Sequence, residues 1–254
     1  RGIGRHVALA LGDLGASVVV VGRTARAAPH ASLPGSVEDT VDELTARGAR
    51  AHGIRADLTD TDDTQAIVDG TLAAFGRCDV VVNNAAYTSN GPMFDVSWRR
   101  WERAFRVQVT APLQLAHGFL PGMIDRGRGT ILNVSSGASQ RLTPGLALYG
   151  TSKLAMERWS EFLALELGEQ PVAVNTLRVD RIVTTEGWQH VADTQGIDVA
   201  TGGAGLGVVM APKLAAAHVV WMLRRPPTWT GRTVGFDDIT TMGGPPTPRL
   251  EPAQ

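Results

Sequence analysis

Apolar residues along the chain alternate between two patterns. One is a short run of β-branched residues, as at 17–21, which is typical of a strand buried on both faces of a parallel sheet. The other is a helical spacing of apolar residues, as at 7–14, where Gly15 follows as a stop signal. The patterns predict strands at 17–21, 51–56, 78–82, 130–134, 172–177 and 233–236, and helices at 7–14, 37–47, 62–75, 97–123, 149–167 and 212–223.

Regular alternation of strand and helix predicts an α/β fold with a doubly wound, Rossmann-like parallel sheet, whose ligands lie at the carboxyl ends of the strands. No break in composition divides the chain, so we expect one domain over 1–242. Within it, the glycine-rich stretch at about 183–210 is expected to form a lid, with Trp188 and Met210 among its apolar residues. The Pro-rich tail at 243–254 is expected to be extended or disordered.

Composition narrows the possible partners. The chain has 254 residues and a net charge of −1 without a long run of either sign, which argues against a nucleic-acid partner. The single cysteine, Cys78, has no second cysteine with which to form an internal disulfide, and no apolar run is long enough to span a bilayer. These features favour a cytoplasmic protein with no membrane partner.

Tyr149 and Lys153 form the strongest chemical signal. They stand four residues apart in a predicted helix, so both side chains project from one face. The chain contains only two tyrosines, and two of its 24 basic residues are lysines, so the pairing is unlikely to be accidental. A phenol with a pKa of about 10 is a poor acid-base catalyst near neutral pH unless a fixed positive charge favours the phenolate, and Lys153 offers that charge.

A serine hydroxyl at the end of a strand completes the group. Ser136 follows the apolar strand at 130–134 and lies 13 residues before Tyr149, where it can hydrogen-bond a substrate oxygen. The adjacent Ser135 is the alternative. The spacing to the Tyr/Lys pair favours Ser136.

Four motifs, in order and spacing, resemble the single-domain short-chain dehydrogenase/reductase family over 1–240. They are Gly2-Ile3-Gly4, Asn83-Asn84-Ala85-Ala86, Ser136 and Tyr149-x-x-x-Lys153. The resemblance implies an oxidoreductase that moves a hydride between a nicotinamide cofactor and substrate carbon without a metal. It implies that Tyr149 is the general acid/base, that Ser136 orients the substrate oxygen, and that Lys153 lowers the tyrosine pKa and holds the nicotinamide ribose. Gln108 stands where the family's catalytic tetrad has asparagine, and its backbone carbonyl is expected to bind the water of a proton relay.

The same resemblance implies a dinucleotide site. Gly2 and Gly4 resemble the last two glycines of the family's pyrophosphate-binding turn, so the first strand and the start of that turn are expected upstream of residue 1. Arg23 after the second predicted strand, together with Arg1, predicts a preference for NADP(H) over NAD(H). The full set of expected cofactor contacts is Arg1, Gly2, Ile3, Gly4, Arg23, Thr24, Asp57, Leu58, Asn84, Ala85, Tyr149, Lys153, Ile182 and Thr184.

Two segments depart from the family pattern. Val179-Asp180 replaces the usual Pro-Gly after the sixth strand, and the insertion at 29–36 resembles members of a hydroxysteroid dehydrogenase-like branch. Three functions remain open. The leading one is reduction of an apolar ketone, or oxidation of the matching secondary alcohol, by a homodimer or homotetramer. An enoyl reductase would need a lysine about seven residues after the tyrosine, where the chain has Met156. A non-catalytic, dinucleotide-binding or regulatory protein with the same fold is the other alternative.

Overall fold

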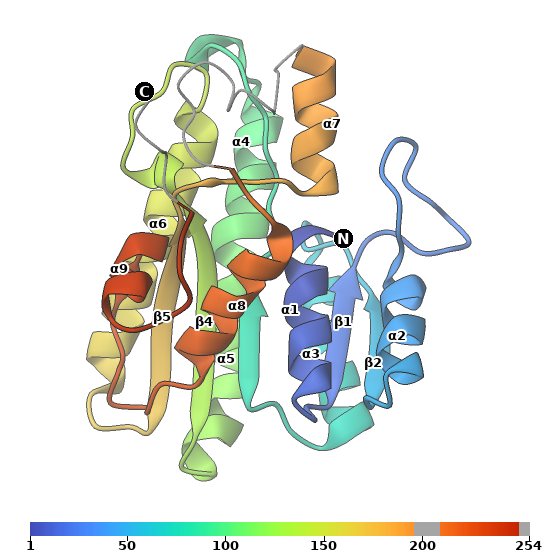
Figure 1. Cartoon of the computed structure of the whole chain (residues 1–254), viewed down its shortest axis with the longest axis vertical. Coiled ribbons are helices and arrows are strands. Elements are labelled where there is room, and N and C mark those ends of the chain that lie inside the picture. The colour runs from blue at the N-terminus through green and yellow to red at the C-terminus, as the bar shows by residue number, and fades with distance from the viewer. Residues whose placement is uncertain (196–208, 249–254) are drawn as a thin grey trace. The chain divides into compact units, whose positions relative to one another are not determined.

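Every strand pair of the computed structural model is parallel, apart from an isolated bridge between Ala25 and Ala28. The structure describes residues 1–195 and 209–248, which form two compact units. The first unit contains Arg1–Arg55, Arg181–Met222 and Phe236–Gln254, and the second contains Ala56–Asp180 and Leu223–Gly235. Figure 1 labels the α-helices and the longer strands of both units.

The second unit is built on a four-stranded sheet in the order β3-β4-β5-β8. Its long central strands are apolar and buried along most of their length, which suits a sheet covered on both faces. The register places Ser135 beside Arg178 and Ser136 beside Val179, so these residues share one edge of the sheet. The strands are β3 (Val80–Asn83), β4 (Gly129–Ser136), β5 (Val172–Val179) and β8 (Thr233–Val234).

Helices of the second unit begin and end where local chemistry predicts. The side chain of Asp60 accepts hydrogen bonds from two backbone amides at the start of α3, and Gly76 ends that helix with a φ of 71°. A five-residue π-helical segment interrupts the long helix expected at 97–123. The helical elements are α3 (Thr61–Phe75), η1 (Met93–Asp95), α4 (Trp98–Phe105), η2 (Arg106–Thr110), α5 (Ala111–Asp125), η3 (Gly137–Ser139) and α6 (Ala147–Leu167).

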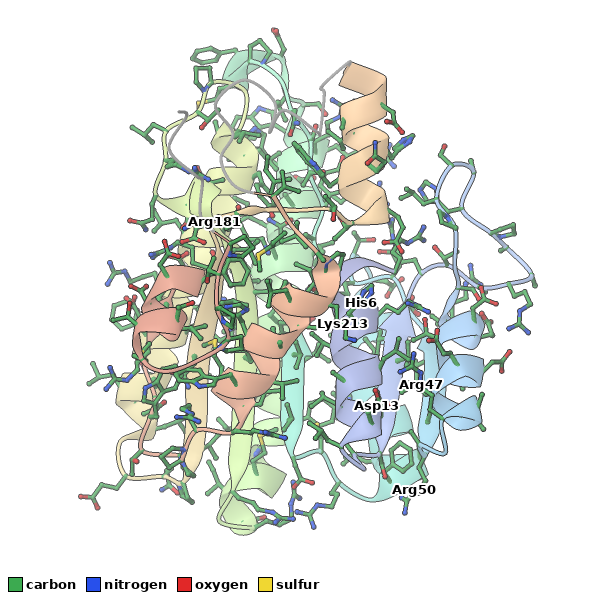
Figure 2. All side chains as sticks on the ribbon, viewed as in Figure 1. His6, Asp13, Arg47, Arg50, Arg181 and Lys213 are labelled. Carbon is green, nitrogen blue, oxygen red and sulfur yellow. The ribbon has the colours of Figure 1, made fainter. Side chains whose placement is uncertain are left out.

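The first unit pairs β1 (Val18–Gly22) with β2 (Ala51–Arg55). Helices α1 (Gly2–Asp13) and α2 (Val37–Ala46) pack on this pair around Leu9, Val18 and Leu44. Arg47 follows α2, and its Nη1 lies 3.1 Å from Asp13 Oδ2 at the end of α1. Both side chains are labelled in Figure 2. The remaining elements of this unit are β6 (Ile182–Val183), α7 (Glu186–Gln195), β7 (Val209–Met210), α8 (Pro212–Leu223) and α9 (Phe236–Thr241).

The structure describes parts of the expected lid and tail. The stretch at about 183–210 contains the β6–β7 pair and helix α7. The start of the tail packs on the protein, because Thr240 Oγ1 donates to Pro245 O at 2.8 Å and Thr247 is only 8% exposed. The other lid residues, at 196–208, and the end of the tail lie outside the described residues. Within the described ranges, none of the helices is both long and apolar enough to cross a bilayer.

Candidate active site

Helix α6 carries Tyr149 and Lys153 on one face, beside the end of β4. The ammonium nitrogen of Lys153 lies 5.8 Å from the centre of the Tyr149 ring. Lys153 is only 1% exposed, and its Nζ donates a hydrogen bond to Val134 O at 2.6 Å. That bond, from α6 to β4, positions a buried positive charge next to the phenol.

The two serines at the end of β4 have different partners. Ser136 lies near enough to Tyr149 to lower the pKa of its hydroxyl, and Ser136 Oγ accepts from Ala138 N at 3.2 Å. Ser135 is buried and donates to Glu157 Oε1 at 2.6 Å. The structure therefore brings Ser136, rather than Ser135, to the tyrosine hydroxyl.

Burial shifts the pKa values of the Tyr/Lys pair in opposite directions, because it penalises the charged form of each. The pKa of Tyr149 is raised by burial, and the nearby Ser136 hydroxyl only partly opposes this effect. The pKa of Lys153 is lowered by burial to about 7, against the opposing attraction of Glu157. The net shift of the Tyr149 pKa is upward, because loss of hydration destabilises the phenolate more than the Ser136 hydroxyl stabilises it.

Gln108 lies in the π-helical segment and is fully buried. Its Oε1 accepts from Tyr87 N at 2.7 Å, and its Nε2 donates to Ser152 Oγ. Ser152 Oγ in turn donates to Tyr149 O at 2.9 Å. The side chain of Gln108 therefore links the loop after β3 to the backbone that carries the tyrosine.

Other residues of the second unit that were expected to bind cofactor lie after β2 and β3. Asp57 Oδ1 accepts from the amide and the hydroxyl of Thr59, at 3.0 and 2.9 Å, which fixes the turn leading to α3 through Leu58. Asn83, the last residue of β3, donates from Nδ2 to Asn133 Oδ1 at 2.8 Å. This buried bond holds the strand end from which Asn84 and Ala85 continue.

The first unit gathers Arg1, Arg23 and Thr24 at the carboxyl end of β1. Arg1 donates from Nη2 to Thr24 Oγ1 and from Nη1 to Pro34 O at 3.3 Å. Burial lowers the pKa of Arg1, Glu186 opposes this, and the positive charge of Arg23 lowers it further. Two arginines close enough to interact, one of them hydrogen-bonded to the Thr24 hydroxyl, suit a phosphate group.

The N-terminus of α1 binds the side-chain carboxylate of Glu186. Gly2 N donates to Glu186 Oε2 at 2.8 Å, and Gly2 has a φ of 61° that favours glycine. Ile3 and Gly4 complete this first turn. The arginine cluster and this amide are donors of the kind that a dinucleotide phosphate requires, so the residues present fit such a cofactor.

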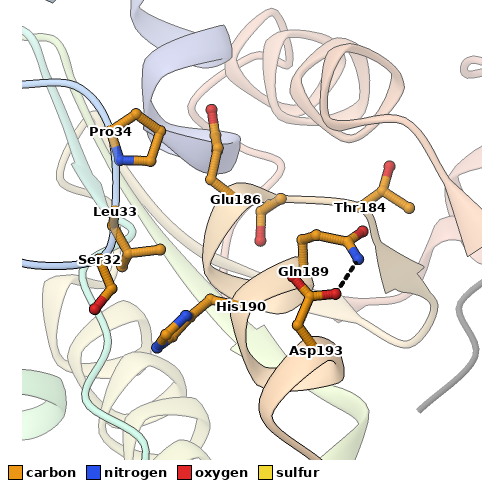
Figure 3. Close-up of a pocket in the computed structure, with 9 residues that line it drawn as sticks. Ser32, Leu33, Pro34, Thr184, Glu186, Gln189, His190 and Asp193 are labelled. Atoms are coloured by element: carbon orange, nitrogen blue, oxygen red, sulfur yellow. Dashed lines mark hydrogen bonds between the residues drawn. The ribbon is translucent and has the colours of Figure 1, made fainter. Parts of the chain in front are cut away.

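A pocket of about 430 Å³ is lined in part by Glu186. Figure 3 shows the residues of its lining. Thr184, from the expected cofactor set, also lines this pocket, and Thr184 N donates to Met210 O at 3.0 Å directly after the pairing of Val183 with Met210. Sequence reasoning missed Glu186, although an acidic residue directly after Thr184-Thr185 is visible there. The lining residues are Ser32, Leu33, Pro34, Thr184, Thr185, Glu186, Gln189, His190 and Asp193.

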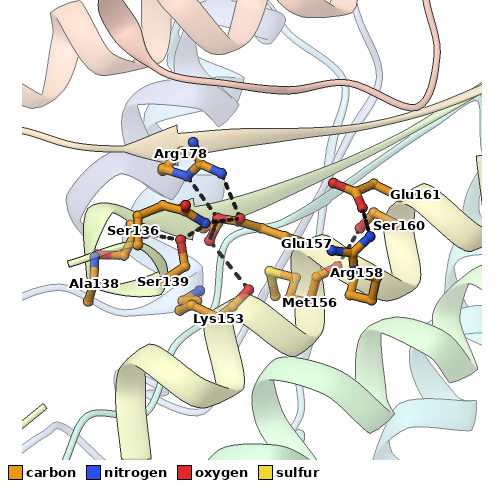
Figure 4. A network of polar contacts seen from close by, with 12 residues as sticks. Ser136, Ala138, Ser139, Lys153, Met156, Glu157, Arg158, Ser160, Glu161 and Arg178 are labelled. Atoms are coloured by element: carbon orange, nitrogen blue, oxygen red, sulfur yellow. Dashed lines mark hydrogen bonds and ion pairs between the residues drawn. The ribbon is translucent and has the colours of Figure 1, made fainter. Parts of the chain in front are cut away.

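Sequence reasoning also missed a buried polar network around Glu157, which Figure 4 shows. Its members come from β4, η3, α6 and β5. The available signal was the position of Glu157, four residues after Lys153 on the same helix.

A family profile described as short chain dehydrogenase matches residues 1–196. The chain belongs to the short-chain dehydrogenase family. A 7alpha-hydroxysteroid dehydrogenase of Escherichia coli (strain K12) is 32% identical over 184 residues, which cover 72% of this chain and 68% of that protein. An L-xylulose reductase of Mesocricetus auratus is 32% identical over 194 residues, covering 76% of this chain and 72% of that protein.

Solved structures with the same fold bind either nicotinamide cofactor. A metagenomic short-chain oxidoreductase in complex with NADP has a TM-score of 0.72 at 28% identity, covering 92% of this chain and 90% of that chain. A 7α-hydroxysteroid dehydrogenase complexed with NADH has a TM-score of 0.78 at 24% identity, covering 92% and 88%. The parallel sheets and these likenesses confirm the predicted Rossmann-like α/β fold. This short-chain dehydrogenase is accordingly an oxidoreductase of the type that uses a nicotinamide dinucleotide.

Proposed function

We propose that this short-chain dehydrogenase interconverts an apolar ketone and the matching secondary alcohol with NADP(H), using Tyr149 as general acid/base. The observation that carries the proposal is the convergence of three groups in the second unit. Ser136 from β4 lies near enough to Tyr149 from α6 to lower the pKa of its hydroxyl, and the Lys153 ammonium lies 5.8 Å from the tyrosine ring. A hydroxyl, a phenol and a buried cation in this arrangement suit proton transfer to a carbonyl oxygen.

The raised pKa of Tyr149 suits the reduction direction. A neutral phenol at neutral pH holds the proton that the forming alkoxide needs, and Ser136 offers a second hydroxyl to the same oxygen. The phenolate left after transfer is stabilised by the ammonium of Lys153. In the oxidation direction the same groups act in reverse. The bound cofactor supplies or accepts the hydride.

The cofactor contacts expected from the sequence are proposed to hold NADP(H). Arg1, Arg23 and Thr24 offer charged and hydroxyl donors for a 2′-phosphate, and this cluster is the reason for preferring NADP(H) to NAD(H). The turn at 2–4 would take the diphosphate. The remaining proposed contacts are Asp57, Leu58, Asn84, Ala85, Lys153, Ile182 and Thr184.

A homodimer or homotetramer in the cytoplasm remains part of the proposal. Helix α6 exposes Leu154, Phe162 and Leu165 to 44%, 56% and 76%, an apolar set that association of two copies would bury. Light scattering of the purified chain would measure its mass directly.

The activity is tested by following NADPH or NADH absorbance with a panel of apolar ketones. Tyr149→Phe should lower turnover by ~10²–10⁴, because it removes the proton donor and keeps the ring. Tyr87→Phe is the matched control, since Tyr87 is the other tyrosine of the chain and is proposed to have no acid-base role. A Tyr149→Phe enzyme with near wild-type turnover would contradict the proposal.

A further inference from the structure

The carboxylate of Glu157 is the centre of the buried network in Figure 4. Its Oε1 accepts from Ser135 Oγ and from Ser139 Oγ, both at 2.6 Å. Arg178 donates to the same carboxylate twice, from Nε to Oε1 at 3.1 Å and from Nη2 to Oε2 at 2.8 Å. The side chain of Glu157 is only 3% exposed, so these partners replace its water.

The network surrounds the catalytic serine from both sides. Ser135 directly precedes Ser136 on β4, and Ser139 follows in η3, with its Oγ also 2.8 Å from Ser136 O. One carboxylate therefore contacts the strand end and the turn that together set the position of Ser136. Glu157 does this from α6, the same helix that presents Tyr149.

Glu157 is also the negative charge nearest in sequence to the buried ammonium, one helical turn beyond Lys153. Burial lowers the pKa of Lys153, and attraction by Glu157 acts in the opposite direction. The charged or titratable groups that contact Lys153 or Glu157 are Tyr149 and Arg178, from α6 and β5. The side chains that β4 and η3 contribute to these contacts are the hydroxyls of Ser135 and Ser139. Because Lys153 is charged only while it keeps its proton, this balance decides whether a cation stands beside the phenol near neutral pH.

Arg178 explains how a carboxylate remains ionised in this position. Burial raises the pKa of Glu157, but the hydrogen bonds from Arg178, Ser135 and Ser139 outweigh it, so that the pKa lies below its usual value. A bidentate guanidinium contact also fixes the orientation of the carboxylate. Without these donors a buried glutamate would take up a proton and lose its charge.

We propose that Glu157, locked by Arg178, is a positioning residue that holds the turn at Ser136 and keeps the Lys153 ammonium charged. It touches neither substrate nor cofactor in this scheme and acts through the two side chains that do. The inference rests on the proposed function, because it deepens the roles given there to Ser136 and Lys153.

The charge on Lys153 can be measured without cofactor or substrate. The chain contains two lysines, so lysine labelled with ¹³C at its terminal carbon gives two side-chain NMR signals, which Lys213→Arg assigns. In Glu157→Gln the titration midpoint of Lys153 should fall by about one pH unit or more, because the attracting charge is gone. An unchanged midpoint would overturn the proposal.

Two further variants make the test specific. Glu161→Gln removes a carboxylate from the same helix, where Glu161 pairs with Arg158 at 2.9 Å on the surface, and it should leave the Lys153 midpoint unchanged. Arg178→Gln removes donors that keep Glu157 ionised, so the Lys153 midpoint should fall in this variant as well. If Glu157→Gln fails to fold, the sign of the Arg178→Gln shift decides, and a rise or no change there overturns the proposal.

Turnover gives the second readout. Glu157→Gln should lower kcat by at least about tenfold and move the alkaline decline of activity to lower pH, whereas Glu157→Asp, which keeps the charge, should restore the pH profile. A chain with no turnover on any ketone but with the expected lysine shift contradicts the proposed function alone. Normal turnover together with an unshifted lysine contradicts the present inference alone.

Discussion

Gln108 Oε1 accepts a hydrogen bond from Tyr87 N at 2.7 Å, across 21 residues of sequence and with Gln108 fully buried. The same amide donates to Ser152, which lies between Tyr149 and Lys153 on α6. The side chain of Gln108 thus bridges the segment after β3 and helix α6.

Replacing Gln108 with leucine keeps the volume and removes both hydrogen bonds. The Tyr87 amide would be left without its partner, so the free energy of unfolding should fall by about 1–3 kcal/mol. Denaturant unfolding measures this loss. Gln65→Leu is the control, because Gln65 is exposed on α3, where its Nε2 donates to Asp69 Oδ1 at 2.9 Å. This variant should change stability by less than about 0.5 kcal/mol. Equal losses in the two variants would show that the buried bridge contributes nothing.

Gly150, directly after Tyr149, leaves no room for a side chain. A Cβ atom there would lie 2.5 Å from Ala138 O in the turn after Ser136. Gly150→Ala should therefore push α6 away from η3, costing about 1–3 kcal/mol of stability and most of the turnover. Gly187→Ala on α7, where the nearest atom would be 3.9 Å away, should be neutral or slightly stabilising. Thermal melts and initial rates compare the two, and a fully active Gly150→Ala enzyme would mean that the close contact does not set the site.

Arg23 and Arg26 offer a matched test of cofactor choice. Arg26 is held by Asp39 and Asp42 at 2.9 and 2.5 Å, whereas Arg23 belongs to the cluster with Arg1. Arg23→Ala should weaken NADPH binding about tenfold or more and leave NADH binding nearly unchanged, since only NADPH carries the 2′-phosphate. Arg26→Ala should leave the ratio of the two dissociation constants as it is. Fluorescence titration with each cofactor measures this ratio, and a constant ratio in Arg23→Ala would remove the argument for NADP(H).

Lys153 should make stability depend on pH in a defined direction. Burial lowers its pKa from the ordinary 10.5 to about 7. Below pH 7 the lysine is charged in both the folded and the unfolded chain, and the full cost of burying the charge applies. Above pH 7 the folded chain sheds the proton while the unfolded chain keeps it, so folding becomes more favourable as the pH rises towards 10.

The comparison with Lys153→Met isolates this effect. From pH 7 to pH 9 the wild-type protein should gain stability relative to the variant, at up to about 1.4 kcal/mol per pH unit. Denaturant unfolding at pH 6, 7, 8 and 9 measures the difference. Lys213→Met, at an exposed position on α8, should show no such trend. If the difference in free energy of unfolding between the wild type and Lys153→Met stays constant from pH 6 to pH 9, burial does not lower the pKa of Lys153.

Local pattern alone was enough for most of the secondary structure. The β-branched run before Gly22 and the capping box at Ser36 are local signals, and β1 and α2 begin and end within about two residues of the prediction. The π-helical segment at Arg106–Thr110 was not predictable in this way. Its apolar spacing is that of an ordinary helix, and the extra residue in the turn accompanies the burial of Gln108 against partners on α6 and after β3.

The sequence by itself determined which chemical groups the site contains, because the spacing of Tyr149 and Lys153 on one helix and of Ser136 at a strand end follows from periodicity alone. Only the tertiary structure decided the pKa values of these groups and hence their protonation. The phenol pKa is raised and the ammonium pKa lowered because α6 is buried against β4, and Glu157 meets Arg178 because β4 and β5 lie side by side in register. Desolvation and contacts between strands distant in sequence depend on packing in three dimensions, and no local pattern of residues specifies them.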